Sequence, residues 1–318
     1  MKNFRKKLNI LLVVLLILSA MPLQIFAVGP VDPAKKADLT IKYVYDKTPV
    51  YGAELSIFRV ASVKGYSEFE VTSQYAKYNL KLDDNSVEEW NKLALTLEGY
   101  TEKDQIKPYK TGATDKNGVL TFNGIDNGLY LLLGKKCVND GYTYFVTPTL
   151  IMVPGIKENY NEWEYEVTAT PKLSRVPLTS GKTERVVMKV WDDKTYPTDR
   201  PSYITVHLMR DGKVIDTQKL DAKMGWTYKW TDLDLADADG AEYRYTISED
   251  PVKYYSTKIS TSGVTFVVTN SLDVKHEDPP KPPYIPQTGQ LWWPVPMLLC
   301  AGAVFLLIGA VRRRREKE

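Results

Sequence analysis

The chain has 318 residues, of which 42 are basic and 39 acidic, for a formal net charge of +3. Residues 1–27 hold four of the basic side chains and residues 289–318 hold five, together with two acids, so the part between them carries 33 basic against 37 acidic residues. This mildly acidic middle argues against nucleic acid as a partner, and two cysteines with two histidines are too few for a disulfide framework or a zinc site, so we expect no metal and no cofactor.

The N-terminus has the pattern of an export signal. Basic residues at positions 2, 5, 6 and 7 precede an apolar core from Ile10 to Ala20, and Ala27 is a small residue suited to cleavage. The sequence therefore predicts a signal peptide over residues 1–27 and a mature protein outside the cytoplasm.

Residues 28–175 are predicted to form an antiparallel β domain. They contain short runs rich in β-branched and aromatic residues, separated by turn signals such as Asp126-Asn127-Gly128. The expected strands span 39–45, 53–61, 118–122, 128–133, 144–153 and 163–170.

One segment of this domain has helical periodicity instead. Ser86 to Glu89 form a capping box, and the apolar residues that follow have helical spacing, namely Trp90, Leu93 and Leu97. We expect a helix over residues 86–98 that ends at Gly99 and packs on the sandwich.

Residues 181–273 are predicted to form a second β domain. Their spacing of strands and turns suits a small immunoglobulin-like sandwich, with strands at 184–191, 203–210, 213–220, 225–230, 243–249 and 263–270. The expected fold class is thus all-β, with two tandem immunoglobulin-like sandwiches. Residues 274–284 are rich in proline and predict a stiff spacer after the second sandwich.

Three polar residues of the second domain could meet in space. Lys189 lies in its first expected strand, Glu249 ends the penultimate one, and Asn270 ends the last. Because the first and last strands of a sandwich commonly pair, Lys189 and Asn270 can be neighbours, with Glu249 in reach of both. Burial would favour a neutral, nucleophilic amine and a protonated carboxyl. From these residues alone, a lysine that reaches solvent or pairs with Glu249 is the better interpretation.

The C-terminal end contains an apolar run long enough to span a bilayer, Leu291–Val311, followed by four arginines at 312–315. A simple tail anchor would need only the apolar run and the arginines. The preceding pentapeptide, however, resembles the LPxTG-type sorting signal of Gram-positive surface proteins, with isoleucine in place of leucine: Ile285, Pro286, Gln287, Thr288 and Gly289. The resemblance implies that a sortase cleaves the Thr288–Gly289 bond and transfers the threonyl group to an amine.

A second resemblance covers residues 185–271, which look like the Cna B-type domains of Gram-positive adhesins and pilins. It rests on the stretches KVWDD, WTYKW, YTISED and FVVTN and on the Arg200-Pro201 turn. In that family, a lysine, a glutamate and an asparagine at these places form an internal isopeptide bond. The resemblance therefore implies a Lys189–Asn270 bond whose formation is catalysed by Glu249.

The first domain lacks parts of this pattern. Lys42 occupies a similar first-strand position, and Tyr130 and Leu132 match the family's YxLxE stretch, but Gly134 stands where the glutamate belongs. No asparagine lies in the expected last strand, 163–170. We predict no isopeptide bond in the first domain, and a different arrangement that uses Lys42 stays open.

The junction between the domains carries a third resemblance, to the WxxxVxVYPK motif of sortase-assembled pilins. Four residues match, whereas alanine and threonine replace the usual valine and tyrosine at positions 169 and 170; the matches are Trp163, Val167, Pro171 and Lys172. In that family the motif lysine supplies the amine that captures the next subunit. On spacing alone, an ordinary linker lysine is the better interpretation of Lys172.

Together these patterns predict a non-enzymatic structural protein, a shaft-type pilin that is secreted and anchored to the cell wall. The implied partners are a sortase, identical pilin subunits, peptidoglycan and, as an open question, host surface ligands. The alternatives are a minor pilin at the base or tip, or a single wall-anchored adhesin. An enzyme is disfavoured, because the sequence has no nucleophile elbow, phosphate loop or metal cluster.

Overall fold

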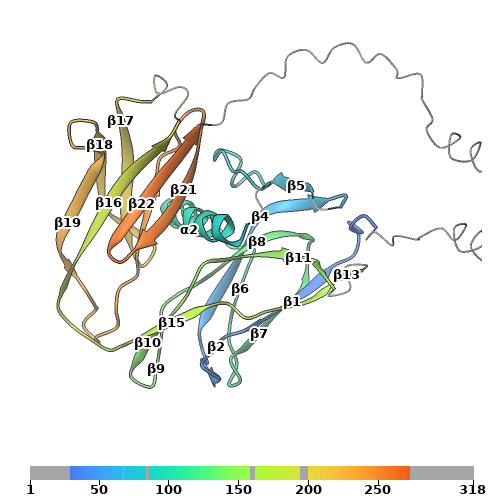
Figure 1. The fold of residues 1–318 in the computed structure, drawn as a ribbon. Coiled ribbons are helices and arrows are strands. Elements are labelled where there is room, and N and C mark those ends of the chain that lie inside the picture. Colours follow the sequence, from blue (N-terminus) through green and yellow to red (C-terminus); the bar gives the residue numbers. More distant parts are fainter. Residues whose placement is uncertain (1–28, 67, 84–85, 158–161, 194–199, 273–318) are drawn as a thin grey trace, which may run out of the picture. The chain divides into compact units, whose positions relative to one another are not determined.

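The computed structural model describes residues 29–66, 68–83, 86–157, 162–193 and 200–272, which form two β-sandwiches and one helix (Figure 1). The expected signal peptide, spacer and sorting signal lie outside these residues. Within the described ranges, no helix has the length and apolar character needed to cross a membrane. The all-β prediction with two immunoglobulin-like sandwiches is confirmed.

The first sandwich consists of several small sheets. One has the order β14-β1-β7, another the order β11-β8-β4-β5 with β6 also on β4, and a third the order β15-β10-β9. The strands are β1 (Ala37–Lys42), β4 (Glu54–Lys64), β5 (Glu68–Val71), β6 (Lys110–Ala113), β7 (Val119–Ile125), β8 (Gly128–Gly134), β9 (Cys137–Asn139), β10 (Tyr142–Val146), β11 (Thr149–Val153), β14 (Glu166–Ala169) and β15 (Leu173–Pro177). Two short hairpins complete it: β2 (Val44–Tyr45) with β3 (Thr48–Pro49), and β12 (Gly155–Ile156) with β13 (Trp163–Glu164).

The core of this sandwich follows from the two-residue period of its strands. Alternate side chains of β1, β4 and β8 point to the same interior and are fully buried: Leu39, Ile41, Leu55, Ile57, Tyr130 and Leu132. The run expected as one strand over 144–153 is two strands, because Thr147-Pro148 interrupts the ladder between β10 and β11.

The second sandwich has two sheets, with orders β19-β16-β22-β21 and β18-β17-β20. The strands are β16 (Lys182–Asp192), β17 (Tyr203–Arg210), β18 (Lys213–Asp221), β19 (Thr227–Asp234), β20 (Tyr245–Glu249), β21 (Tyr255–Ser262) and β22 (Thr265–Leu272). The first and last strands, β16 and β22, pair as predicted, and the structure shows that their pairing is parallel.

One strand of this sandwich was not expected. β21 lies between β20 and β22 in the chain, so Glu249 ends the third strand from the C-terminal end and not the penultimate one. Its sequence, YSTKISTS, is mostly polar, yet Ser256 and Thr257 are buried. Hydrophobicity alone therefore gave little indication of the strand.

The helix, α2 (Val87–Lys103), begins as predicted but runs past its expected end. Ser86 is the N-cap, and its hydroxyl accepts a hydrogen bond from the Glu89 amide at 3.3 Å. The expectation that Gly99 ends the helix is wrong. Gly99 lies against β20, where an added methyl group would overlap the carbonyl oxygen of Ile247 and sit 3.2 Å from its carbonyl carbon. The glycine thus permits close packing of the helix on a strand.

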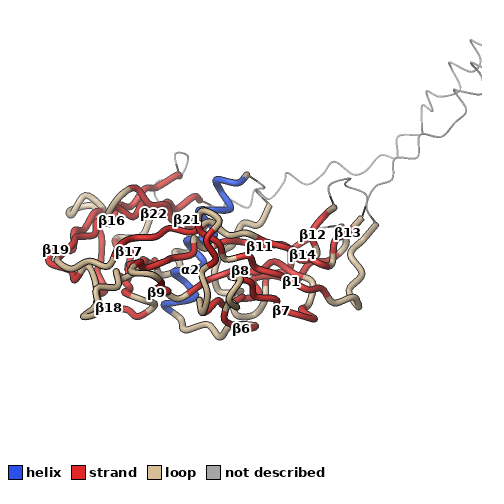
Figure 2. The backbone as a smooth tube through the Cα atoms, turned by 90° about the horizontal axis from the view of Figure 1, so that it is seen from below, coloured by secondary structure: helices blue, strands red, loops and turns tan. Residues whose placement is uncertain are grey.

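Helix α2 contacts both sandwiches: β8 and β11 of the first, and β20 and β21 of the second (Figures 1 and 2). Leu93 and Leu97 pack in a core cluster of the first sandwich, whereas Leu95 packs against the core of the second. The Thr96 hydroxyl accepts a hydrogen bond of 2.8 Å from the Ile259 amide on β21. The helix therefore covers strands at the edges of both sheets of the second sandwich, β20 and β21.

Buried charges accompany this packing. Arg244, next to β20, donates two hydrogen bonds to the Glu98 carboxylate, at 2.7 and 3.0 Å. One helical turn later, Glu102 accepts a hydrogen bond from Thr246. Burial, together with the nearby Glu98 carboxylate, raises the pKa of Glu102 to about 8.

Candidate functional site

The three polar residues singled out in the second domain lie together in its interior. Lys189 and Glu249 have side chains with 0% exposure, and the Lys189 Nζ lies 3.7 Å from the Glu249 Oε1. The Asn270 Nδ2 lies 3.3 Å from the same carboxyl oxygen. The parallel register of β16 and β22 brings this about, since it sets Lys189 beside Val268 and Trp191 beside Asn270. Strands β16, β22 and β20 thus contribute Lys189, Asn270 and Glu249, respectively.

Burial changes the preferred protonation states of the pair. Burial lowers the pKa of Lys189 to about 8, although the adjacent carboxyl group of Glu249 opposes this. Burial likewise raises the pKa of Glu249, opposed mainly by Lys189. Both shifts favour a neutral amine beside a neutral carboxylic acid. The Lys189 Nζ is held by the carbonyl oxygens of Val190 and Val268, at 3.1 and 3.2 Å.

The Asn270 side chain is placed to receive a proton or a hydrogen bond. Its Oδ1 is buried and has no hydrogen-bond partner among the described residues. A half-turn of the amide would bring this oxygen to the place of Nδ2, beside the Glu249 carboxyl. There a protonated Glu249 would donate to the carbonyl oxygen and make the Asn270 carbonyl carbon more electrophilic.

Aromatic rings and a second ion pair surround the cluster. The Lys189 Nζ lies 4.3 Å from the centre of the Trp191 ring, which packs edge-on against Trp226 and Tyr255. The Tyr255 hydroxyl donates to Asp193 at 2.9 Å. The Arg200 guanidinium forms two more hydrogen bonds with Asp193, at 2.5 and 2.7 Å. The rings pack around the buried Lys189 amine, and the Asp193–Arg200 pair holds the end of β16 in place.

Thr257, on the strand that the sequence analysis missed, is the fourth polar residue of the cluster. Its hydroxyl donates a hydrogen bond of 2.9 Å to the Glu249 Oε2, so both carboxyl oxygens have a neighbour. The alternation of Tyr255, Thr257 and Ile259 is the only signal that could have indicated this strand.

The junction lysine has a fixed backbone and an exposed side chain. Lys172 is exposed, lies between β14 and β15, and follows the buried Pro171. Its carbonyl oxygen accepts a hydrogen bond from the Thr147 amide at 2.8 Å. The amine is therefore presented to solvent from an anchored segment.

The first sandwich offers no similar cluster at Lys42. This side chain is exposed at the end of β1. At Gly134, an added Cβ would lie 2.7 Å from Leu55 and 2.9 Å from Val146, so core side chains occupy the space that a glutamate would need. The absence of an isopeptide bond in this domain stays a prediction, which this packing supports.

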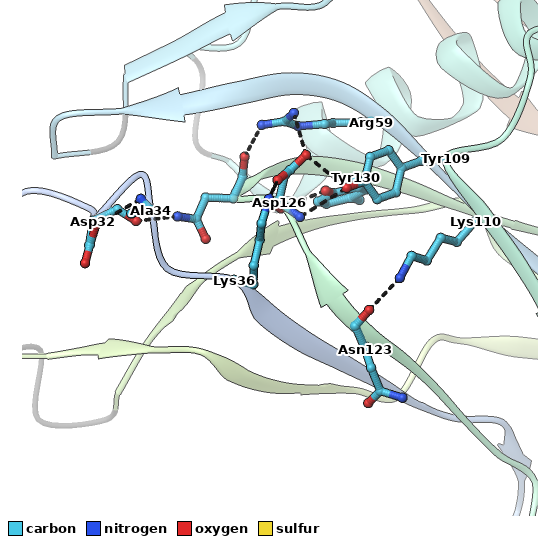
Figure 3. Close-up of polar contacts among 10 residues, drawn as sticks. Asp32, Ala34, Lys36, Arg59, Tyr109, Lys110, Asn123, Asp126 and Tyr130 are labelled. Carbon is cyan, nitrogen blue, oxygen red and sulfur yellow. Dashed lines mark hydrogen bonds and ion pairs between the residues drawn. The ribbon is translucent and has the colours of Figure 1, made fainter.

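Another lysine–carboxylate pair of the first sandwich shows the contrast with Lys189 (Figure 3). Asp126 contacts Lys36 and accepts a hydrogen bond of 3.0 Å from the Tyr109 hydroxyl, while Arg59 lies 3.4 Å away. The Lys36 side chain is 58% exposed. Its hydrogen bond to Asp126 raises the pKa of Lys36, so the amine stays protonated and is no nucleophile. This pair is a tether between the N-terminal segment and the turn before β8.

Two further expectations concern metals and the sorting signal. Within the ranges that the structure describes, no group of three or more histidine, cysteine, aspartate or glutamate side chains could hold a metal ion. Ile285, Pro286, Gln287, Thr288 and Gly289 lie outside those ranges.

Residues 186–271 match the family model of the Cna protein B-type domain. The second sandwich, with its parallel first and last strands and its buried lysine, glutamate and asparagine, therefore has the Cna B-type fold. A stretch of 109 residues, 34% of this chain, is 37% identical to the collagen adhesin of Staphylococcus aureus and spans 9% of that protein.

Two solved structures are among those to which the chain is similar. The chain is similar to a single B repeat unit of the collagen-binding surface protein of Staphylococcus aureus, at 18% identity and a TM-score of 0.28, over 76% of this chain and 100% of that one. It is also similar to the full-length major pilin SpaD of Corynebacterium diphtheriae, at 15% identity and a TM-score of 0.29, over 76% and 65% of the respective chains.

Proposed function

We propose that this chain is a structural subunit of a covalent cell-surface pilus, polymerised and anchored to peptidoglycan by a sortase, with a Lys189–Asn270 isopeptide bond in its second sandwich. The observation that carries the proposal is the buried contact of Glu249 with both Lys189 and Asn270 in a domain of Cna B-type. Lysine is among the residues least often fully buried, so the burial of Lys189 beside an acid and an amide marks a candidate reactive site.

The reaction is a transamidation that occurs once per molecule. The neutral Lys189 amine attacks the Asn270 side-chain carbonyl carbon while the protonated Glu249 donates to the carbonyl oxygen. Glu249 then passes a proton from the attacking nitrogen to the departing amide nitrogen. The new C–N bond replaces the old one, and one molecule of ammonia leaves.

Polymerisation would use the two other predicted sites. Sortase cleaves after Thr288 of one subunit and transfers the threonyl group to the exposed Lys172 amine of another. Each subunit thus has one donor and one acceptor, and such a head-to-tail arrangement does not close on itself but extends into a fibre. The internal bond ties the first strand of the second sandwich to the last, which leads to the anchored end. Tension along the fibre then passes through a covalent link.

A single wall-anchored adhesin is the second candidate, favoured by the 37% identity to part of a collagen adhesin. In such a protein Lys172 would have no role in assembly.

Two experiments test the proposal. The intact mass of the mature chain, residues 28–288, should be lower than its sequence mass by one ammonia, about 17 Da, and Glu249→Ala should restore the full mass. In a Gram-positive host that carries the cognate sortase, wall extracts should contain a ladder of oligomers with a Thr288–Lys172 crosslinked peptide.

Lys172→Arg should abolish the ladder, whereas Lys116→Arg, at an exposed turn of the same sandwich, should leave it intact. A monomer joined only to peptidoglycan would instead identify an adhesin. An intact mass equal to the sequence mass would show that the internal bond does not form.

A further inference from the structure

We propose that Thr257, on β21, is a positioning residue for isopeptide formation, which fixes the orientation of the Glu249 carboxyl group and directs its proton toward Asn270. The inference rests on the proposed function, because it concerns the same reaction. It gives a role in the chemistry to the one strand of the second sandwich that the sequence did not predict.

Thr257 connects the two sheets of the second sandwich at the reaction site. Lys189 and Asn270 belong to neighbouring strands of one sheet, whereas Glu249 ends β20 in the other sheet. Thr257 lies directly opposite Asn270 in the antiparallel pairing of β21 with β22, so the two side chains share one face. Its hydroxyl donates to the Glu249 Oε2 at 2.9 Å. This bond therefore ties the acid to the sheet that carries the two reacting groups.

The hydrogen bond also determines which oxygen of the protonated carboxyl group carries the proton. The carbonyl oxygen of a carboxylic acid is its stronger acceptor, and Thr257 donates to Oε2, so the acid proton belongs on Oε1. Oε1 is the oxygen that faces the reacting groups, 3.3 Å from the Asn270 Nδ2 and 3.7 Å from the Lys189 Nζ. After a half-turn of the amide, the Asn270 oxygen would accept this proton in a hydrogen bond, which activates the carbonyl carbon.

The same bond stabilises the negative charge that forms on Glu249 as its proton leaves. The hydrogen bond from Thr257 lowers the pKa of the Glu249 carboxyl group, against the effect of burial. Thr257 is 6% exposed and Glu249 is 0% exposed, so solvent does not replace the hydroxyl in this role. Without it, Glu249 would be a weaker acid with a less defined orientation. A hydrogen bond to a charged group contributes enough free energy to change a rate by about tenfold.

The experiment follows the crosslinking rate as the mature chain, residues 28–288, folds. The chain is recovered unfolded in urea with its full sequence mass, folding is started by dilution, and samples are quenched in acid at intervals. The fraction lighter by one ammonia is read from the intact mass. Thr257→Val replaces the hydroxyl with a methyl group and should slow the reaction by about tenfold. Thr257→Ser restores a hydroxyl and should recover most of the rate.

The matched control is Thr246→Val, which removes another buried threonine hydroxyl from β20, the strand that carries Glu249. Thr246 is 5% exposed and donates to Glu102 on α2, and its position in β20 places it on the opposite face from Glu249. Its loss should leave the crosslinking rate unchanged. Equal slowing in Thr246→Val, an unaltered rate in Thr257→Val, or no recovery in Thr257→Ser would overturn the inference and leave the crosslink itself standing. If the unaltered chain loses no ammonia, the proposed function fails instead.

The pH dependence of the rate separates positioning from a loss of stability. Glu249 interacts electrostatically with Lys189 of β16 and with Tyr100 of α2, and Asp193 acts on Lys189; all of these groups are the same in every variant. Because the Thr257 hydrogen bond lowers the pKa of Glu249, its loss should keep the acid protonated to higher pH. Thr257→Val should therefore move the alkaline limb of the rate profile to higher pH. A slower rate with an unmoved limb would contradict the inference.

Discussion

Replacing Gly99 with alanine tests how closely α2 is docked on β20. An added methyl group would overlap the Ile247 carbonyl oxygen and lie 3.2 Å from the Ile247 carbonyl carbon and 3.4 Å from the Ser248 Cα. These are backbone atoms of a buried strand, so the helix would have to retreat by about 1 Å to restore normal contacts. Overpacking of this kind costs about 1–3 kcal/mol, and the upper end applies to a rigid backbone neighbour.

The opposing effect is the helix propensity of alanine. In a solvated helix, Gly→Ala stabilises by about 1 kcal/mol. We therefore expect a net loss of about 2 kcal/mol in the free energy of unfolding, measured by urea denaturation of the mature chain after its crosslinked state has been checked by mass. Amide exchange on β20 should become faster as well.

The control is Asn91→Ala, at an exposed position of the same helix, which should stabilise slightly. If Gly99→Ala stabilises the protein as Asn91→Ala does, the helix is not docked against the Ile247 carbonyl group.

Three further outcomes are expected. Arg244→Met leaves Glu98, whose side chain is 5% exposed, buried without its cation, and this should reduce the free energy of unfolding by about 3–5 kcal/mol. Adding Glu98→Leu should recover most of that loss. If the losses of the two single variants simply add in the double variant, Arg244 and Glu98 do not form a direct pair. The pKa of Glu102 is raised to about 8, so above about pH 4.5 the folded state holds a proton that the unfolded state has released. The free energy of unfolding should therefore fall as the pH rises from 5 to 8. In urea titrations Glu102→Gln should flatten this dependence on pH, and an unaltered dependence would assign it to other groups. Asn270→Ala should prevent the crosslink and reduce the free energy of unfolding by roughly 4.5 kcal/mol, because the constraint on a loop of about 80 residues is lost. If the variant unfolds at the same urea concentration as the unaltered chain, the bond does not stabilise the fold.

Local patterns in the sequence predicted much of the fold. The two-residue alternation of Leu39 and Ile41 identified a half-buried strand, and the capping box at Ser86 located the start of the helix. The end of the helix was missed at Gly99, because a glycine that ends a helix and a glycine that lets a helix approach a strand look alike in the sequence.

The candidate site was likewise only partly predictable. Lys189 and Asn270 could be placed side by side because they lie in the first and last strands of a sandwich. The contribution of Thr257 could not, since its strand is mostly polar and its burial beside Glu249 shows only in the folded sandwich.

The sequence by itself determined many of the strands, where the helix starts and which strands carry the lysine, the glutamate and the asparagine, because side-chain periodicity and capping depend on residues close together in the chain. Only the tertiary structure decided that Lys189 and Glu249 are fully buried, and that Thr96 on α2 accepts a hydrogen bond from the Ile259 amide on β21. Burial and such long-range hydrogen bonds depend on how separate elements pack in three dimensions, and no local pattern records that packing.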